Sequence, residues 1–269
     1  MESTEWTIVH VERPWKGRTE PLKLLLEDAG VPYAVRCEEL GPAISFDLWR
    51  GSEAAITVDS TPFPVMFPPA IWHRPHDGEE VFVNTQIACM RYLGQCLGYA
   101  PSSAAEGARA DQIAQNAVDY WVEGRVCFHP LDSSHLGSYS SQKEAAEKSS
   151  QEWSRTRMRL WLQHFEKVVS RDPGPRKPCA GGASVTFADF LLFHVLDATE
   201  AQFNSEHFSF AWDAAGCEGL KAYKAPLLGR SRASSTGVST ILIIYIYIHT
   251  VCAYLDICLC LCVYMYIYI

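Results

Sequence analysis

The sequence has little of what marks a nucleic-acid-binding, secreted or zinc-binding protein. Lys and Arg number 23 against 31 Asp and Glu, and the resulting net charge of −8 argues against nucleic acid as a partner. The six cysteines before residue 227 form no CxxC pair, so we expect reduced thiols and no metal site. Residues 1–5 are acidic and lack an apolar run, so we expect no signal peptide and a cytoplasmic protein. Hydrophobic residues make up 48% of the chain, enough for the cores of one or two domains.

The most informative stretch begins at two prolines. Proline has no N–H group, so Pro69 belongs at a sheet edge or a sharp turn, and we expect a cis peptide bond before it. Residues 70–72 and 81–83 read as short strands, and the His-Asp-Gly at 76–78 as the turn between them.

A helix is expected next, with a first turn that suits an anion. Asn84 or Thr85 can cap this helix, and Gly98 can end it. An extended peptide can pair with the backbone beside Pro69, and a carboxylate can bind the free amide groups at the helix start. The pattern fits such a binding site or an ordinary hairpin and helix. The Thr85 side chain could cap the helix or bind a ligand, because both roles need the same position at the helix start.

The N-terminal third supplies the elements that precede this stretch. Residues 6–11 and 31–35 read as strands, and a helix between them opens at Thr19-Glu20-Pro21 and ends at Gly30. The order β-α-β, then β-β-α, is typical of a thioredoxin-like layered domain.

Two separated motifs resemble the cytosolic glutathione transferase family. Residues 17–33, Gly-Arg-Thr-Glu-Pro-Leu through Gly-Val-Pro-Tyr, are similar to the first helix of sigma-like members. The glutathione-binding motif of the family is a cis proline before a strand and a polar pair opening a helix that ends in Tyr-Leu. That motif is matched by Pro69-Ala70-Ile71, Asn84-Thr85 and Arg91-Tyr92-Leu93-Gly94. The resemblance implies a thioredoxin-like glutathione-binding domain over residues 4–97 and an all-helical domain over 106–226.

The second half has helical patterns throughout. Apolar residues recur at spacings of three and four over 110–121, and a second long helix is expected over about 142–170. Thr186 and Asp189 form a capping-box pattern before an apolar run, which resembles the capped core helix of the family. The last helix of this domain is expected to close at Pro226.

The tail, residues 227–269, differs from the rest of the chain. Its last 29 residues, 241–269, contain Asp256 as their only Asp, Glu, Lys or Arg, which satisfies the length and apolarity of a transmembrane helix. Their Tyr-Ile repeats are strand-like and of low complexity. We favour a gene-model error over a membrane anchor, so a membrane is expected as a partner only if the tail is real. A chain that ends at Pro226 is then expected to fold.

The sequence does not identify the residue that would activate the glutathione thiol. The glutathione thiol has a pKa of about 8.5, and only its thiolate is a good nucleophile. The resemblance implies a Tyr five residues before Gly17, but that position is Glu12, and no Tyr, Ser or Cys stands between Ile8 and Gly17. A carboxylate beside the sulfur would raise the thiol pKa. Arg13, Lys16 or Arg18 could supply a compensating positive charge. Arg18 matches a family arginine that is usually held structurally near the active site, so the resemblance favours a structural role for it. His10, at the end of the first strand, is a further candidate activator.

Two functions are therefore consistent with the sequence. One is a glutathione transferase that uses glutathione as co-substrate, needs no metal, conjugates hydrophobic electrophiles and forms a homodimer. The other is a non-catalytic member of the same fold that binds glutathione or acts as an interaction module. The resemblance implies glutathione contacts at Pro69, Ala70, Asn84, Thr85 and Trp49, although a Trp in an apolar stretch is usually core. The electrophile site is expected from the aromatic residues Tyr120, Phe128 and His129, with Trp121 and Tyr139 as further candidates.

Overall fold

The computed structural model describes most of the chain between residues 5 and 234. The described residues are 5–10, 17–36, 63–64, 69–132, 140–171, 178–179, 184–203 and 205–234. The expectations for Glu12, Arg13, Lys16, Trp49, Tyr139 and residues 241–269 lie outside these ranges, as does the Pro68 side of the peptide bond before Pro69.

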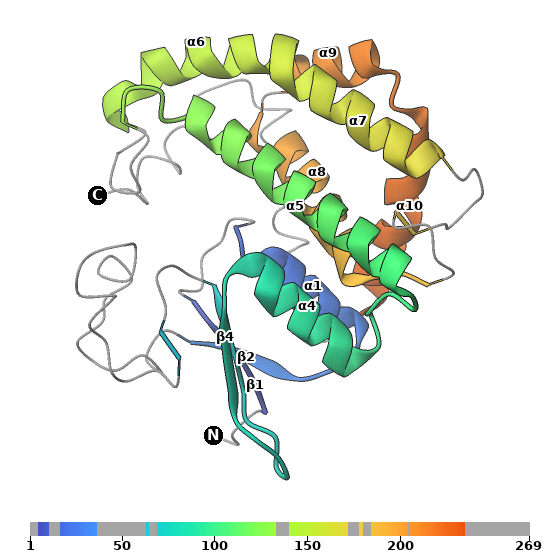
Figure 1. The fold of residues 1–269 in the computed structure, drawn as a ribbon. Coiled ribbons are helices and arrows are strands. Elements are labelled where there is room, and N and C mark those ends of the chain that lie inside the picture. The colour runs from blue at the N-terminus through green and yellow to red at the C-terminus, as the bar shows by residue number, and fades with distance from the viewer. Residues whose placement is uncertain are drawn as a thin grey trace.

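The first half of the described chain forms a four-stranded sheet with two helices against one face (Figure 1). The strand order is β2-β1-β3-β4, with β1 and β2 parallel and the other neighbours antiparallel. The elements in chain order are β1 (Trp6–Val9), α1 (Glu20–Asp28), β2 (Tyr33–Arg36), β3 (Ala70–His73), β4 (Val81–Asn84) and α4 (Gln86–Leu97).

The spacing of apolar residues along α1 explains how this half is packed. Leu22, Leu25 and Leu26 lie on one face of α1 and are fully buried. They pack with Ile8 and Ile71, which are register partners on β1 and β3 and are also fully buried. The expected thioredoxin-like order is confirmed, because the strands and helices predicted from the sequence form at those places.

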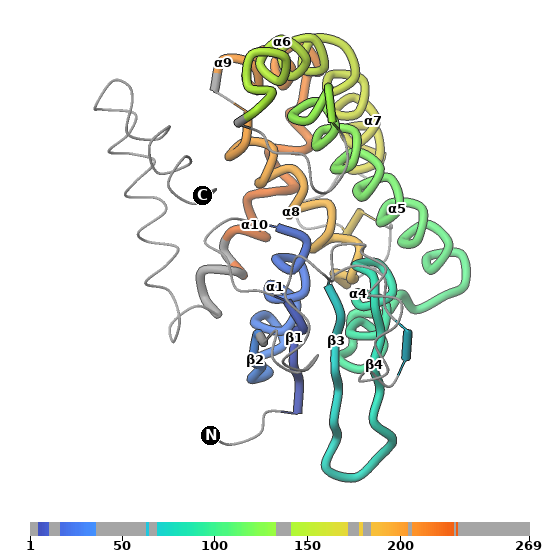
Figure 2. The backbone as a smooth tube through the Cα atoms, turned by 90° about the vertical axis from the view of Figure 1, so that its left-hand side faces the viewer, coloured from blue at the N-terminus to red at the C-terminus, as the bar shows by residue number. Residues whose placement is uncertain are grey.

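After Ser103 the described residues form helices and no strand. Figure 2 shows these helices stacked above the sheet half. They are α5 (Ala104–Cys127), a 3₁₀ turn (Ser140–Gln142), α6 (Lys143–Trp153), a π-helical turn (Ser154–Met158), α7 (Arg159–Ser170), α8 (Phe187–Gln202), α9 (Ser205–Ala215) and α10 (Glu218–Ser234). The all-helical second half is therefore confirmed over the described residues.

The predicted capping box at the start of α8 is confirmed. The Asp189 carboxylate accepts hydrogen bonds from the Thr186 amide (2.8 Å) and hydroxyl (3.0 Å). It also accepts from the Cys179 amide (2.7 Å) and the Tyr223 hydroxyl (3.1 Å). A carboxylate that is only 1% exposed needs several such donors, so Asp189 ties α10 and the chain before α8 to this helix start.

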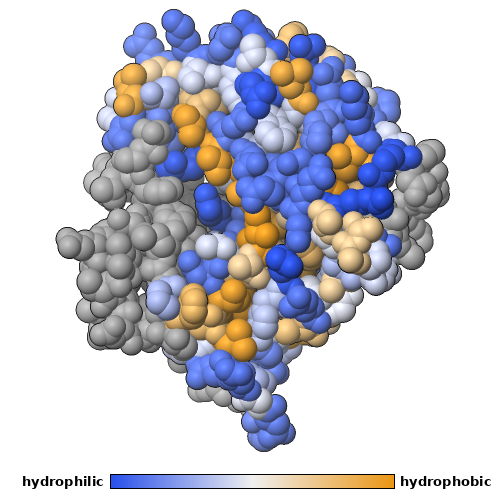
Figure 3. Space-filling view, in the orientation of Figure 1, coloured by the Kyte–Doolittle hydropathy of each residue, from blue (hydrophilic) through white to orange (hydrophobic). Residues whose placement is uncertain are grey.

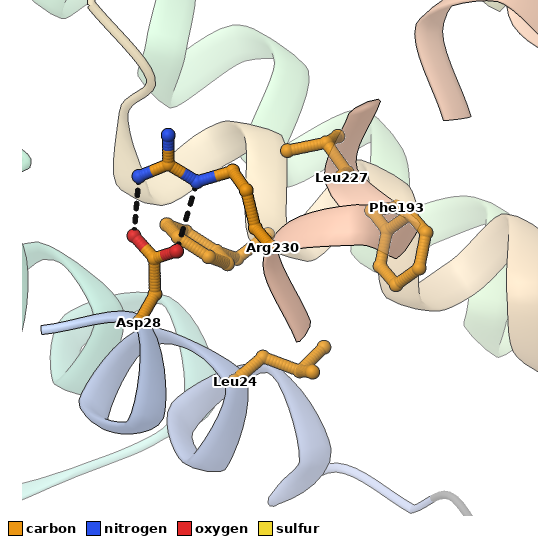
Figure 4. Close-up of a pocket in the computed structure, with 6 residues that line it drawn as sticks. Leu24, Asp28, Phe193, Leu227 and Arg230 are labelled. Carbon is orange, nitrogen blue, oxygen red and sulfur yellow. Dashed lines mark hydrogen bonds and ion pairs between the residues drawn. The ribbon is translucent and has the colours of Figure 1, made fainter. Parts of the chain in front are cut away.

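The expected end of the last helix at Pro226 is wrong. Pro226 lies inside α10, which continues to Ser234. Leu227 is buried, and the Arg230 guanidinium pairs with the Asp28 carboxylate of α1 (Figure 4). These two contacts hold the helix together beyond a proline that would break an isolated helix.

The two halves meet mainly through helices. α1 and α4 contact α8, and α10 contacts α1 (Figures 1 and 2). The amide of Phe187, at the start of α8, donates to the carbonyl of Tyr99, just after α4 (3.0 Å). On the face shown in Figure 3, apolar residues form short patches among hydrophilic ones. Over the described residues, no helix combines the length and apolarity needed to cross a membrane.

Candidate functional site

The junction between β3, β4 and α4 brings four of the predicted site residues together. Ala70 and Asn84 are register partners on β3 and β4. The Asn84 side-chain amide donates to the Pro69 carbonyl oxygen (2.8 Å), and the Thr85 backbone amide donates to the same oxygen (3.1 Å). The carbonyl of Pro69 thus fixes the position at which α4 begins.

Thr85 has an unusual backbone conformation. Its φ is +73° and its ψ is 143°, and no other described residue besides glycine has a positive φ. For a β-branched residue this conformation is strained by about 1–3 kcal/mol, and such strain clusters at ligand sites. The side chain is exposed and makes no capping hydrogen bond to α4. The hydroxyl and the first amides of α4 therefore lie at a helix N-terminus suited to an anion.

A buried glutamine joins this junction to the start of α1. Gln86 is 5% exposed, and its side-chain amide donates to the Arg18 carbonyl oxygen (2.7 Å). Burial, and next the nearby charge of Arg125, lower the pKa of Arg18. The N-termini of α1 and α4 and the C-terminal end of α5 therefore converge in one region.

The predicted electrophile residue Tyr120 lies in the helical core, not in an open site. It is 1% exposed, and its ring packs against Trp153, Trp161 and Phe165 with centroid distances of 5.4, 6.1 and 5.6 Å. Burial raises the pKa of its hydroxyl well above the ordinary value. Tyr120 is therefore removed from the candidate site.

The other two predicted electrophile residues are partly buried at the end of α5. Phe128 packs against Phe203 with a centroid distance of 5.0 Å. The amide of His129 donates to the Val126 carbonyl (2.9 Å), and its ring lies 3.4 Å from the Gln142 side-chain amide. Trp121, the further candidate, packs near His194 at 5.3 Å, so its ring belongs to the helix packing.

Sequence reasoning missed the face of α5 that stays open. Val122, Arg125 and Val126 are spaced i, i+3 and i+4, so they share one side of the helix, and His129 lies just beyond its end. Val122 is 40% exposed and Val126 43%. This spacing is visible in the sequence, but valine and arginine carry no aromatic signal that marks an electrophile site.

The described cysteines are mostly buried. Cys89, Cys127, Cys179 and Cys217 are buried, and Cys96 is exposed. Burial raises the pKa of Cys89 to about 12, which keeps this thiol protonated at neutral pH. Within the part of the chain that the structure describes, no group of three His, Cys, Asp or Glu residues could hold a metal ion.

Comparisons of the sequence link the chain to known proteins. Residues 128–228 match the family model described as the glutathione S-transferase C-terminal domain. The chain is also similar to glutathione S-transferase Mu 1 of Rattus norvegicus. The two are 24% identical over 185 residues, which cover 68% of this chain and 71% of that protein.

Comparisons of the fold agree with the sequence matches. The Pi-class glutathione S-transferase of Onchocerca volvulus superposes with a TM-score of 0.58 at 17% identity, covering 84% of this chain and 88% of that one. Prostaglandin synthase D of Nilaparvata lugens superposes with a TM-score of 0.55 at 17% identity, covering 87% and 98%. At these identities the likeness shows a shared fold, a thioredoxin-like part followed by a helical part.

Proposed function

We propose that this chain is a member of the cytosolic glutathione transferase family, and that it binds glutathione and joins its thiol to hydrophobic electrophiles. The proposal rests on one observation: the strained backbone of Thr85 lies beside the carbonyl of Pro69, whose oxygen accepts two hydrogen bonds. Strain of this kind persists where the surrounding bonds hold it for a ligand.

Glutathione would lie along the junction as an extended peptide. Its backbone would pair beside Pro69 and Ala70, as in the addition of a strand to a sheet. Its γ-glutamyl carboxylate would meet the Thr85 hydroxyl and the N-terminus of α4, supported by Asn84. By the family resemblance, Trp49 would also contact glutathione. These roles are proposals that rest on the geometry of the junction and on family membership.

The reaction needs a thiolate at neutral pH. The sulfur attacks the electrophilic carbon, a carbon–sulfur bond forms, the leaving group departs with its electron pair, and the thiol proton goes to solvent. Arg18 is one candidate to favour the thiolate, because a positive field lowers a thiol pKa, although the family resemblance favours a structural role for it. Arg13, Lys16 and His10 remain alternatives from the sequence.

The electrophile would bind between the two halves, against the end of α5. Phe128 and His129 remain candidates for this wall, joined by Val122 and Val126. We propose a glutathione-binding domain over residues 4–97 and a helical domain over residues 106–234, a homodimer, and a cytoplasmic location.

A second function follows from Glu12, the residue in the slot where relatives place the activating Tyr. A carboxylate there would oppose the thiolate, which favours a non-catalytic protein that binds glutathione or a partner. Glu12→Tyr separates the two functions, because it replaces a repelling charge with a donor to the sulfur. A higher conjugation rate supports the enzyme, and unchanged activity means that another residue activates the thiol. Binding of glutathione by both forms without conjugation supports the non-catalytic protein.

Retention of the full chain on a glutathione matrix tests the binding site. Asn84→Ala combined with Thr85→Ala removes two polar groups, each worth about 1–3 kcal/mol if a charged group depends on it. We expect the double variant to pass through the matrix. Thr85→Ser keeps the hydroxyl and should be retained. Equal retention of all forms would contradict the proposed site.

A further inference from the structure

A cavity opens between α8, α9 and α10. Its volume is about 420 Å³, which lies within the usual range for small-molecule sites, about 300–1,000 Å³. Residues of all three helices line it, among them Glu200 of α8, Phe208, Trp212 and Asp213 of α9, and Lys221 and Lys224 of α10. None of these residues belongs to the junction of β3, β4 and α4, so a ligand in this cavity would occupy a second site.

Two aromatic rings form an apolar wall of the cavity. Phe208 and Trp212 are one turn apart on α9, and their ring centroids lie 5.2 Å apart at an interplanar angle of 36°. The two residues are only 7% and 8% exposed, so the surrounding helices hold both rings in place. Their exposed edges therefore offer a fixed apolar surface on which the ring of a ligand would pack.

A nearly buried cation stands beside this wall. The Lys224 side chain is 10% exposed, and its ammonium group donates to the Glu200 carboxylate (2.7 Å), whose side chain is 57% exposed. An ammonium group has three N–H donors, and the bond to Glu200 uses one of them. Lys224 can therefore donate to an anionic group in the cavity while it keeps its bond to Glu200.

The charges that line the cavity are of both signs. Lys221 lies one turn before Lys224 on α10, and Asp213 adds a carboxylate on the α9 side to that of Glu200. A ligand with a single charge would meet as many like charges as opposite ones. A ligand with both charges can match each to an opposite side chain, which favours it over either singly charged analogue.

We propose that this cavity binds a small aromatic zwitterion of the aromatic amino acid type. The α-carboxylate would accept from Lys224, the α-ammonium group would donate to Glu200, and the ring would pack on Phe208 and Trp212. An amino acid carries both charged groups on one carbon atom, which suits two side chains whose charged atoms lie 2.7 Å apart. The inference does not depend on the proposed transferase function, because it uses none of the residues assigned to glutathione.

Three indole compounds test the inference by calorimetric titration of the full chain. L-Tryptophan carries both charges, indole-3-propionate carries only the carboxylate, and tryptamine carries only the ammonium group. The shared indole ring makes the comparison one of charge. The Kd for L-tryptophan should be lower than either of the other two by roughly 10-fold, because each analogue lacks one charged hydrogen bond.

Two variants remove the charged partners one at a time. Lys224→Met keeps most of the aliphatic stem and should raise the Kd for L-tryptophan roughly 10-fold without weakening the binding of tryptamine. Glu200→Gln should raise the Kd for L-tryptophan to a similar extent without weakening the binding of indole-3-propionate. Lys148→Met is the control, because it removes the same charge from an exposed position on α6 and should change none of the three values.

Thermal unfolding of each variant shows whether it is folded. Glu200 is more than half exposed, so Glu200→Gln decides the question alone if Lys224→Met does not fold. Three results would overturn the site: no binding of L-tryptophan at millimolar concentration, equal Kd values for the three compounds, or a Kd for L-tryptophan that the folded variants leave unchanged. An equal loss of binding in Lys148→Met would also contradict it.

Discussion

Arg230 of α10 donates from its Nε atom to Asp28 of α1 (2.8 Å), and its Nη2 atom binds the other oxygen of the same carboxylate. The Tyr99 hydroxyl, just after α4, donates to that carboxylate as well (2.6 Å). Figure 4 shows this ion pair with the apolar side chain of Leu24 below it and that of Leu227 to its right. One carboxylate therefore joins the sheet half, the connection after α4 and the last helix.

The first prediction concerns the ion pair between Arg230 and Asp28. Arg230→Ala should lower the free energy of unfolding by about 1–3 kcal/mol, because the Asp28 carboxylate, only 9% exposed, loses a charged partner. Arg91→Ala breaks a more exposed pair with Asp111 and should cost less than about 1 kcal/mol. Urea unfolding of both variants measures the difference, and equal losses would contradict the role of Arg230.

The same ion pair changes what is expected of a chain that ends at Pro226. A chain that ends at Ser234 keeps Leu227 and Arg230, whereas a chain that ends at Pro226 loses both. The shorter chain should therefore unfold at a lower urea concentration than the longer one. Coincident unfolding curves would mean that α10 beyond Pro226 contributes nothing to stability.

A second prediction compares two helical glycines. A Cβ atom at Gly219 would lie 2.3 Å from the Ser170 hydroxyl and 2.6 Å from a Glu166 carboxylate oxygen. That carboxylate caps α10 by accepting from the Gly219 and Leu220 amides (2.8 and 2.9 Å). Gly219→Ala should destabilise the fold by about 1–3 kcal/mol, through overpacking and loss of the cap.

Gly107 supplies the control for that substitution. A Cβ atom there meets nothing within 4 Å, so Gly107→Ala in α5 should stabilise the fold by about 0.5–1 kcal/mol. Thermal unfolding of the two variants should therefore shift in opposite directions. A shift of the same sign for both would show that helix propensity, not the packing of Glu166 and Ser170, determines the effect.

A third prediction concerns the strain at Thr85. Glycine adopts a positive φ without steric cost, so Thr85→Gly should raise the free energy of unfolding by about 1 kcal/mol. The same change removes the proposed hydroxyl contact and should weaken retention on a glutathione matrix. Greater stability with undiminished retention would mean that the strain does not serve this ligand.

A fourth prediction concerns pH and His164. Burial, and second the charge of Lys167, lower the pKa of His164, whose Nε2 atom lies 2.8 Å from the Asn116 side-chain amide. The unfolded chain therefore takes up this proton first as pH falls below about 6.5. The neutral His164 imidazole therefore makes its full contribution to the free energy of unfolding above that pH. This contribution is lost as pH falls toward the lowered pKa of the folded state.

The slope of stability against pH measures this effect. Between about pH 7 and pH 5, the wild-type chain should lose more stability than His164→Gln does. His76→Gln is the control, because the His76 side chain is 98% exposed and should leave the slope unchanged. Parallel slopes for the wild type and His164→Gln would contradict the prediction.

Local signals in the sequence were sufficient for much of the fold. Gly30 and Gly98 were predicted as helix ends, and both adopt positive φ values (69° and 83°) that favour glycine. The Thr186 and Asp189 cap was predicted from spacing alone, because both of its partners lie within one helical turn.

Relationships between distant segments could not be predicted in this way. Pro226 reads as a helix end, and only the contact of Arg230 with Asp28, 202 residues away in sequence, explains why α10 continues. Periodicity separates the two faces of α5, but it does not reveal which face meets other helices. Tyr120 was therefore expected in the site, although its side chain lies in the helical core.

Conjugation of glutathione to 1-chloro-2,4-dinitrobenzene by the full chain tests the central claim most directly. The account predicts a rate that saturates in both substrates and that is lost when Asn84 and Thr85 are both changed to Ala. A chain that fails to bind a glutathione matrix and gives only the uncatalysed rate would contradict it.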